Sequence, residues 1–164
     1  MLYMEPIQEW IETYRLTPHP EGGMFSESYT APDAAEGRSL AGSIYFLLRG
    51  DELSHLHQID CEEVWYYHAG GGLVITMIDP ATGGVDRALL GPDAAAGQRF
   101  MVVVPKGRLF ASENLDKSRA TLVSCMTAPH FDYAGFRLIS REELSRLCPA
   151  RAQELGYLSI STTP

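Results

Sequence analysis

The residues best suited to chemistry lie in one short stretch, where His55 and His57 are followed by Glu62 and Glu63. Alternate side chains of a β-strand point to the same face, so both imidazoles are expected on one side and Leu56 on the other. A short turn after the histidines would bring a glutamate onto the neighbouring strand. Two histidines and a carboxylate converging from adjacent strands suit a metal site or an acid/base pocket.

The elements that must position these residues are mostly strands. From residue 24 to residue 139, short apolar runs are separated by Gly, Pro and Asp, which is the pattern of a sandwich or barrel. No long helical pattern interrupts them, so a parallel α/β sheet is not expected. The expected strands cover residues 24–30, 40–48, 53–58, 62–68, 72–78, 86–90, 99–104, 108–112, 119–127 and 134–139.

Helices are expected only at the two ends of the chain. Apolar residues recur at helical spacing between residues 4 and 16, and Pro6 suits a first turn. Ser140 and Glu143 form a capping-box pattern, which begins C-terminal helices over residues 140–156. We therefore expect one domain over residues 1–164, with a strand-rich body at residues 24–139.

Composition and charge exclude several classes of function. The chain has 164 residues and a net charge of -8, without a cluster of Lys and Arg, so a nucleic-acid surface is not expected. Residues 1–5 lack the features of a signal peptide, and no apolar run is long enough to span a membrane. We expect a cytoplasmic protein without membrane partners. Cys61, Cys125 and Cys148 have no metal-binding spacing and are expected to be reduced thiols.

The order of these motifs resembles the cupin family, whose fold is a double-sheet jelly roll. Glu63 and Gly70 keep the spacing that ends the first cupin motif, but His55 and His57 do not both fit its histidine positions. In the second motif, Phe110 stands where a histidine is usual. Because a catalytic metal usually needs three or more ligands, no cofactor is predicted. A divalent metal held by His55, His57 and Glu63 remains the alternative, and a one-residue shift of register decides which histidine faces inward.

A narrower resemblance runs along most of the chain, to the small cupins of the DUF985 (Cupin_5-like) group, described as predicted sugar epimerases. Departures are Ser26, Leu109 and His130, where Arg, Trp and Gly are usual. The matching segments are Pro20-Glu21-Gly22-Gly23-Met24-Phe25-Ser26-Glu27, Ser54-His55-Leu56-His57 with Glu62-Glu63-Val64-Trp65, Val104-Pro105-Lys106-Gly107 and Ala128-Pro129-His130-Phe131-Asp132-Tyr133.

The resemblance implies an all-β, double-stranded β-helix (jelly roll) that binds a small molecule. The expected activity is metal-independent acid/base isomerisation or epimerisation of a sugar-like or other small polar substrate. In this hypothesis His57 removes a proton, Glu63 orients His57, and Tyr67 or Tyr133 returns the proton. The alternatives are a non-catalytic metabolite-binding protein and a metal-dependent cupin enzyme. The resemblance also implies a homodimer.

Further residues are candidates for the pocket wall. Glu27 would add a second carboxylate if it points inward, and aromatic side chains can stack on a sugar ring. His19 and His130 lie in loops beside prolines and are interpreted as structural or incidental, with a position near the pocket rim as the alternative for His130. The residues expected to bind substrate are Glu27, Tyr45, Trp65, Tyr67, Phe110 and Tyr133.

Overall fold

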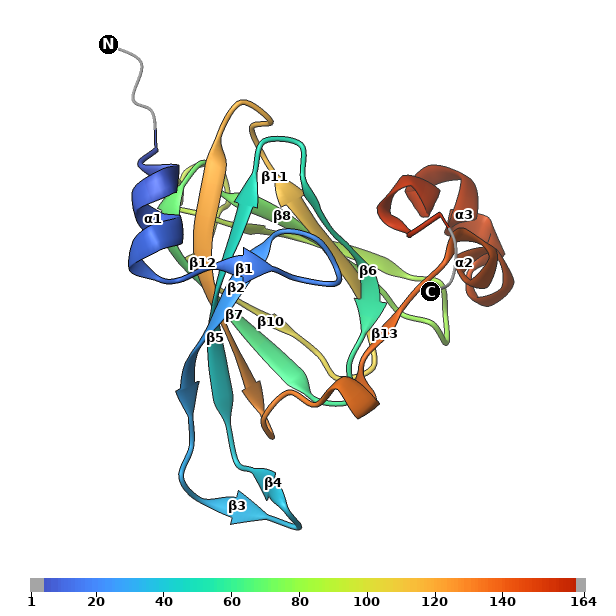
Figure 1. Ribbon diagram of the computed structural model, residues 1–164. Helices are drawn as coiled ribbons and strands as arrows, with labels where there is room; N and C mark the ends of the chain where they lie inside the picture. Colours follow the sequence, from blue (N-terminus) through green and yellow to red (C-terminus); the bar gives the residue numbers. More distant parts are fainter. Residues whose placement is uncertain (1–4, 162–164) are drawn as a thin grey trace.

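The computed structural model describes residues 5–161 and consists of two antiparallel sheets that face each other (Figure 1). One sheet has the order β1-β2-β5-β12-β7-β10, and the other has the order β13-β6-β11-β8-β9. The jelly-roll expectation is confirmed. Strands of the first sheet are β1 (Thr17–Pro18), β2 (Met24–Thr30), β5 (Gly42–Arg49), β12 (Ala120–Ala128), β7 (Glu62–Gly70) and β10 (Met101–Val104). Strands of the second are β13 (Arg137–Leu138), β6 (Leu53–Gln58), β11 (Leu109–Asn114), β8 (Leu73–Ile78) and β9 (Val85–Leu90).

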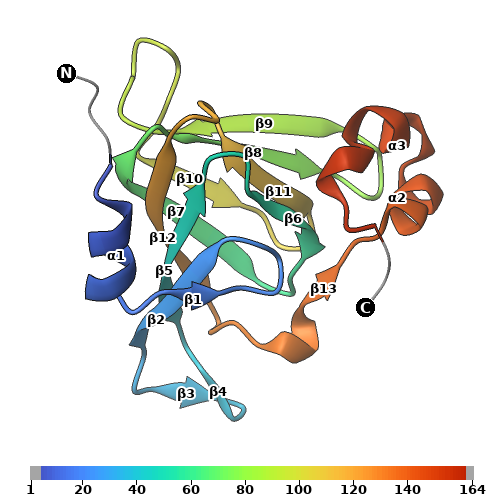
Figure 2. The same ribbon diagram turned by 45° about the horizontal axis from the view of Figure 1, so that its top comes forward.

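A small ribbon of β3 (Ala34–Ala35) and β4 (Arg38–Ser39) extends from the connection between β2 and β5 (Figures 1 and 2). These two strands and β1 were not expected from the sequence. The expected strand 134–139 is mostly a 3-10 turn, Tyr133–Gly135, followed by the short β13. The Asp132 carboxylate accepts a hydrogen bond from the Ala134 amide and so starts that turn.

The core between the sheets explains why β5 is apolar along its length. Phe46 and Leu48 point inward to a cluster that includes Trp65 and Phe110. Leu47 points outward and packs with the N-terminal helix. Both faces of this strand are therefore buried, as is expected for a near-continuous apolar run.

Short helices cover the outer faces of the sheets (Figure 2). α1 (Ile7–Thr13) is shorter than the expected 4–16, because Arg15 has a positive φ of 54° that ends it; Met4 lies outside the described residues. α2 (Arg141–Leu147) and α3 (Pro149–Leu155) pack their leucines against Leu56 and Leu109. Ser140 accepts a hydrogen bond from the Glu143 amide at the start of α2, as the capping-box pattern predicts. Within residues 5–161, no helix is long and apolar enough to cross a membrane.

Candidate functional site

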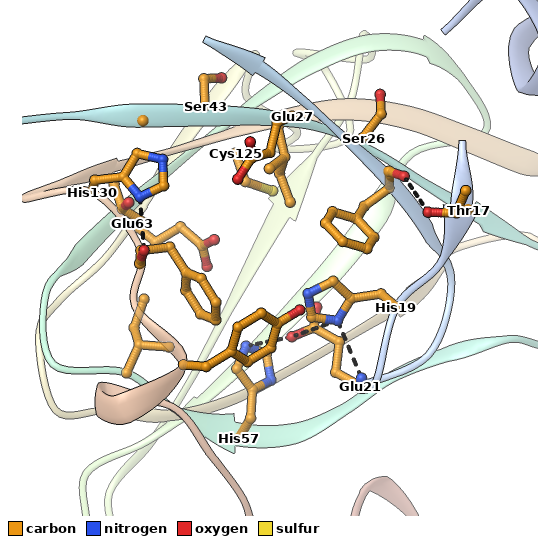
Figure 3. Close-up of a pocket in the computed structure, with 17 residues that line it drawn as sticks. Thr17, His19, Glu21, Ser26, Glu27, Ser43, His57, Glu63, Cys125 and His130 are labelled. Atoms are coloured by element: carbon orange, nitrogen blue, oxygen red, sulfur yellow. Dashed lines mark hydrogen bonds and ion pairs between the residues drawn. The ribbon is translucent and has the colours of Figure 1, made fainter. Parts of the chain in front are cut away.

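A cavity of about 390 Å³ opens between the two sheets, next to the core (Figure 3). Such a volume suits a small-molecule ligand. Its wall is made by the segment before β2, by strands from both sheets and by the loop after β12. The lining residues are Thr17, His19, Glu21, Phe25, Ser26, Glu27, Gly42, Ser43, Ile44, His57, Ile59, Glu63, Cys125, Thr127, His130, Phe131 and Tyr133.

A buried pair, Glu21 and His57, forms one wall of this cavity (Figure 3). The Nε2 atom of His57 lies 3.1 Å from Oε2 of Glu21. The other carboxyl oxygen, Oε1, accepts a hydrogen bond of 2.8 Å from the Ser54 hydroxyl. Glu21 and His57 are 7% and 2% exposed, so neither group has water as its main partner. This carboxyl–imidazole pair is a proton-holding unit inside the protein.

Close backbone approach places Glu21 beside β6. Its carbonyl accepts hydrogen bonds of 2.7 Å from both the amide and the ring Nδ1 of His55. The next residue, Gly22, has a φ of 108°, and a Cβ atom there would lie 2.0 Å from the Leu53 carbonyl oxygen. Only glycine fits this position without strain. The glycine that follows Glu21 therefore fixes the carboxyl group over the histidine.

An irregularity in β6 separates the two histidines. Phe110 pairs with His57 while Ser112 pairs with Ser54, so two residues of β6 lie opposite one residue of β11. Such a bulge breaks simple alternation. Ser54 and His57 both reach the Glu21 carboxyl, whereas His55 contacts the Glu21 backbone and does not line the cavity. The expectation that both imidazoles face one site is therefore wrong, and His57 is the inward histidine.

The hydrogen bonds of His57 show where its protons lie. Its Nδ1 is 2.7 Å from the His55 carbonyl oxygen, which can only accept, so Nδ1 carries a hydrogen. A proton must then lie between Nε2 and the Glu21 carboxyl. Burial raises the pKa of Glu21 and lowers the pKa of His57 to about 4. Both effects favour a neutral pair in which Glu21 donates the shared proton to His57.

Glu63 enters the cavity from β7, in the opposite sheet (Figure 3). Its Oε2 accepts a 3.0 Å hydrogen bond from the Trp65 indole, and no other hydrogen bond or ion pair reaches its side chain from the described residues. Burial and the nearby Glu21 carboxyl raise the pKa of Glu63 to about 8, against the smaller opposing effect of the indole. A carboxyl group that titrates near neutral pH can both take up and release a proton during a reaction. Glu63 was expected to orient His57, but Glu21 is the residue that does so.

The structure places the expected substrate-binding residues in three groups. Glu27 and Tyr133 line the cavity. Trp65 and Phe110 lie behind it, Trp65 bonded to Glu63 and Phe110 packed with a ring-centroid distance of 4.0 Å from His57. Two others lie outside the cavity lining: Tyr45 packs beside Tyr14 on the outer face, and Tyr67 donates a hydrogen bond to the Gly70 carbonyl.

The donor set does not fit the alternative metal site of His55, His57 and Glu63. His55 lies outside the cavity lining, and its ring Nδ1 is hydrogen-bonded to the Glu21 carbonyl. His57 uses Nδ1 for a backbone bond and Nε2 for Glu21. Across residues 5–161, no three His, Cys, Asp or Glu side chains gather as a metal-binding group. We therefore derive no step through a metal.

Three site residues were missed or set aside in the sequence. Glu21 was noted only as part of a motif, although the glycines that follow it signalled a close backbone approach. His19 lines the cavity, and its Nδ1 accepts a hydrogen bond from the Glu21 amide. His130 also lines it, with Nδ1 donating to the Phe131 carbonyl. The interpretation of both histidines as structural or incidental did not place His19 at the cavity, whereas a position at the pocket rim was the alternative for His130.

The cavity cysteine is a poor nucleophile. Burial raises the pKa of the Cys125 thiol well above its ordinary value, and the nearby Glu63 carboxyl adds to this effect. Burial likewise raises the pKa of Cys61 to about 11. Because the thiolate is the reactive form, covalent catalysis by these cysteines is disfavoured.

Comparison with known proteins gives a family and two solved structures that span the chain. The family model described as Cupin superfamily (DUF985) matches residues 8–139. The protein SO0799 from Shewanella oneidensis is 39% identical, with a TM-score of 0.91 over 97% of this chain and 100% of that chain. A hypothetical protein from Leishmania major is 29% identical, with a TM-score of 0.87 over the same shares.

More distant structures share only the fold. Oxalate decarboxylase from Bacillus subtilis is 15% identical, with a TM-score of 0.57 over 86% of this chain and 36% of that chain. CapF from Staphylococcus aureus is 15% identical, with a TM-score of 0.53 over 71% and 30%. No curated protein matches the chain.

Proposed function

Because this chain belongs to the DUF985 family of the cupin superfamily, we propose that its cavity binds a small polar molecule and moves a proton on it by acid/base catalysis. The proposed reaction is an isomerisation or epimerisation next to a carbonyl group. The observation that carries the proposal is the placement of two proton-holding groups on opposite walls of one cavity, the Glu21–His57 pair and Glu63 (Figure 3).

Glu63 is the proposed base. In its ionised form it takes a proton from the carbon next to the substrate carbonyl, and its pKa of about 8 makes it basic enough to do so near neutral pH. Its Trp65 partner holds the carboxyl in place through Oε2, and Oε1 has no hydrogen bond from the described residues.

The Glu21–His57 pair is the proposed acid on the other wall. It holds one proton between Oε2 and Nε2, and it can pass that proton to the opposite face of the planar intermediate. A base and an acid on two faces give inversion at the carbon, as an epimerase requires. Ser54 keeps the Glu21 carboxyl aligned when the proton leaves.

Hydrogen–deuterium exchange tests this proposal on many candidate substrates at once. The protein is incubated in D₂O with a panel of aldoses, ketoses and amino sugars, and mass spectrometry detects a mass increase at the carbon-bound position. We expect exchange in at least one compound, retained in Glu62→Gln and lost in Glu63→Gln, whereas His57→Gln should lose inversion more strongly than exchange. Glu62 is the matched control because it is the exposed neighbour of Glu63 on the same strand.

Failure of the exchange has a defined meaning. If a panel compound binds the folded protein but none exchanges a proton, the catalytic proposal fails and the chain is a metabolite-binding protein. If exchange persists in Glu63→Gln and inversion persists in His57→Gln, the assignment of the two groups is wrong.

A second copy of the chain is the proposed macromolecular partner. What supports a homodimer is the edge strand β10, where apolar side chains are exposed: Phe100 beside it at 66%, Met101 at 50% and Val103 at 41%. Unpaired edges that carry apolar side chains favour association. Light scattering coupled to size exclusion should give twice the 18.1 kDa mass of one chain, and the mass of a single chain would contradict the dimer.

A further inference from the structure

The cavity wall combines three carboxyl side chains with three histidines, and burial lowers the pKa of His19 and of His57. The carboxyl side chains are those of Glu21, Glu27 and Glu63, and no Lys or Arg is among the described lining residues. Arg38 contacts the lining residue His130, but its guanidinium is committed: Nε donates to the His130 carbonyl, and the two terminal nitrogens bind Asp60. An anionic group entering this cavity would therefore meet carboxyl groups without a Lys or Arg side chain among the described lining residues to balance its charge.

Two of these carboxyl groups have unused acceptor atoms. Glu63 is 8% exposed and lines the cavity, and its Oε1 has no hydrogen bond from the described residues (Figure 3). Glu27 lies on β2 and forms no hydrogen bond or ion pair within the described part of the chain. Glu27 is exposed, so water can reach its carboxylate. Glu63 is buried and has only the Trp65 indole as a hydrogen-bond donor among the described residues, so its ionised form is costly, and a ligand that supplies positively charged donors lowers that cost.

Aromatic rings complete the wall. Phe25, Phe131 and Tyr133 line the same cavity, and the rings of Phe131 and Tyr133 pack edge to face with centroids 4.9 Å apart. Aromatic faces attract ammonium groups through their quadrupole. Ser26 and Ser43 add hydroxyl groups that can bind the polar body of a ligand (Figure 3).

We propose that the ligand of this cavity is a small organic cation, an amine whose body carries hydroxyl groups, and that sugar phosphates and sugar acids are rejected. Glu63 and Glu27 would bind the ammonium group, and the aromatic rings would cover its apolar side. The inference rests on the proposed function for its site and names the substrate class of that site.

A matched charge series tests the inference. Glucose, glucosamine, glucuronate and glucose 6-phosphate share one ring and differ in charge, and glycerol, serinol and glycerate form a smaller series. Calorimetry and thermal shift on the full chain should show an amine binding at least about tenfold more tightly than its neutral parent, which corresponds to about 1.4 kcal/mol. The anions should produce no shift.

Variants assign the selectivity to the two carboxyl groups. Glu27→Gln and Glu63→Gln should each weaken the amine about tenfold, while Glu62→Gln should bind it as the wild type does. Anions that bind as tightly as amines, neutral sugars that match them, or no binding by an amine of either series would each overturn the inference.

The outcomes separate this inference from the proposed function. Selective binding of amines without any deuterium exchange would leave the inference standing while the catalytic proposal fails. Deuterium exchange on neutral or anionic compounds, with no preference for amines in binding, would support the catalytic proposal and overturn the inference about the ligand.

Discussion

The two walls of the cavity carry the same side-chain type in different surroundings. Glu21 is held by the Ser54 hydroxyl and shares a proton with His57, whereas Glu63 has one indole donor and otherwise faces the cavity. Both are less than a tenth exposed. Burial alone therefore does not decide the catalytic role of a carboxyl group. The hydrogen-bond partners of the group decide whether the carboxyl keeps its proton or exchanges it with a ligand.

Among the variants that separate the two walls, Glu63→Gln should cause the largest loss of deuterium exchange. Glu63→Gln keeps the size of the side chain and can still contact Trp65, but it cannot take up a proton. We expect deuterium exchange to fall about 10²–10⁴-fold, the usual contribution of a general base. Mass spectrometry of the exchanged substrate measures it. Exchange within a few-fold of the wild type would show that Glu63 is not the base.

Removal of the proton that Glu21 shares with His57 should cause the next largest loss of activity. In Glu21→Gln an amide donor still faces Nε2 of His57, so the fold is expected to remain, but no acidic proton is shared. We expect epimerisation to fall about 10²-fold. Exchange of the substrate hydrogen by Glu63 alone should persist more strongly than inversion, which polarimetry detects. Equal loss of both in this variant would remove the distinction between the two walls.

Stability should reveal the cost of an ionised Glu63. Its folded pKa of about 8 lies above the ordinary value of 4.5, so the folded state loses stability as pH rises from about 4.5 through 8. Glu63→Gln removes this loss. We expect the variant to exceed the wild type by at least about 1 kcal/mol in unfolding free energy at pH 9, and by little at pH 5. Urea titrations at the two pH values measure the difference. A constant difference would mean that Glu63 titrates in its ordinary range.

The pH profile of exchange sharpens the comparison further. Because the base must be ionised, kcat/KM should rise with pH up to about 8 and then level off. Removal of the indole donor in Trp65→Phe should move this rise to higher pH by about one unit, since the lost hydrogen bond stabilises the carboxylate. Ser54→Ala is the matched control on the other wall, and it should leave the rise in place. An unmoved profile in Trp65→Phe would show that the indole does not tune Glu63.

The strand pattern predicted the jelly roll and the segment that carries the site, since alternation and turn residues are local signals. The same local reasoning failed at β6, where the bulge between Ser54 and His57 depends on pairing with β11. Local sequence patterns also could not identify the partner of His57. Glu21 lies far from His57 in the sequence, and the bend at Gly22 brings the two residues together. The aromatics were assigned by type, and only the sheet geometry separates Tyr133, which lines the cavity, from Tyr45 on the outer face.

Carbon-13 NMR of protein labelled at its glutamate carboxyl groups tests the central claim most directly. Spectra of Glu63→Gln and Glu21→Gln assign the two signals by their absence. The account predicts that the Glu63 signal titrates near pH 8 and that the Glu21 signal keeps its proton above the range of ordinary carboxyl groups. If both signals instead titrate near 4.5, the two walls hold ordinary carboxylates and the acid/base account is contradicted.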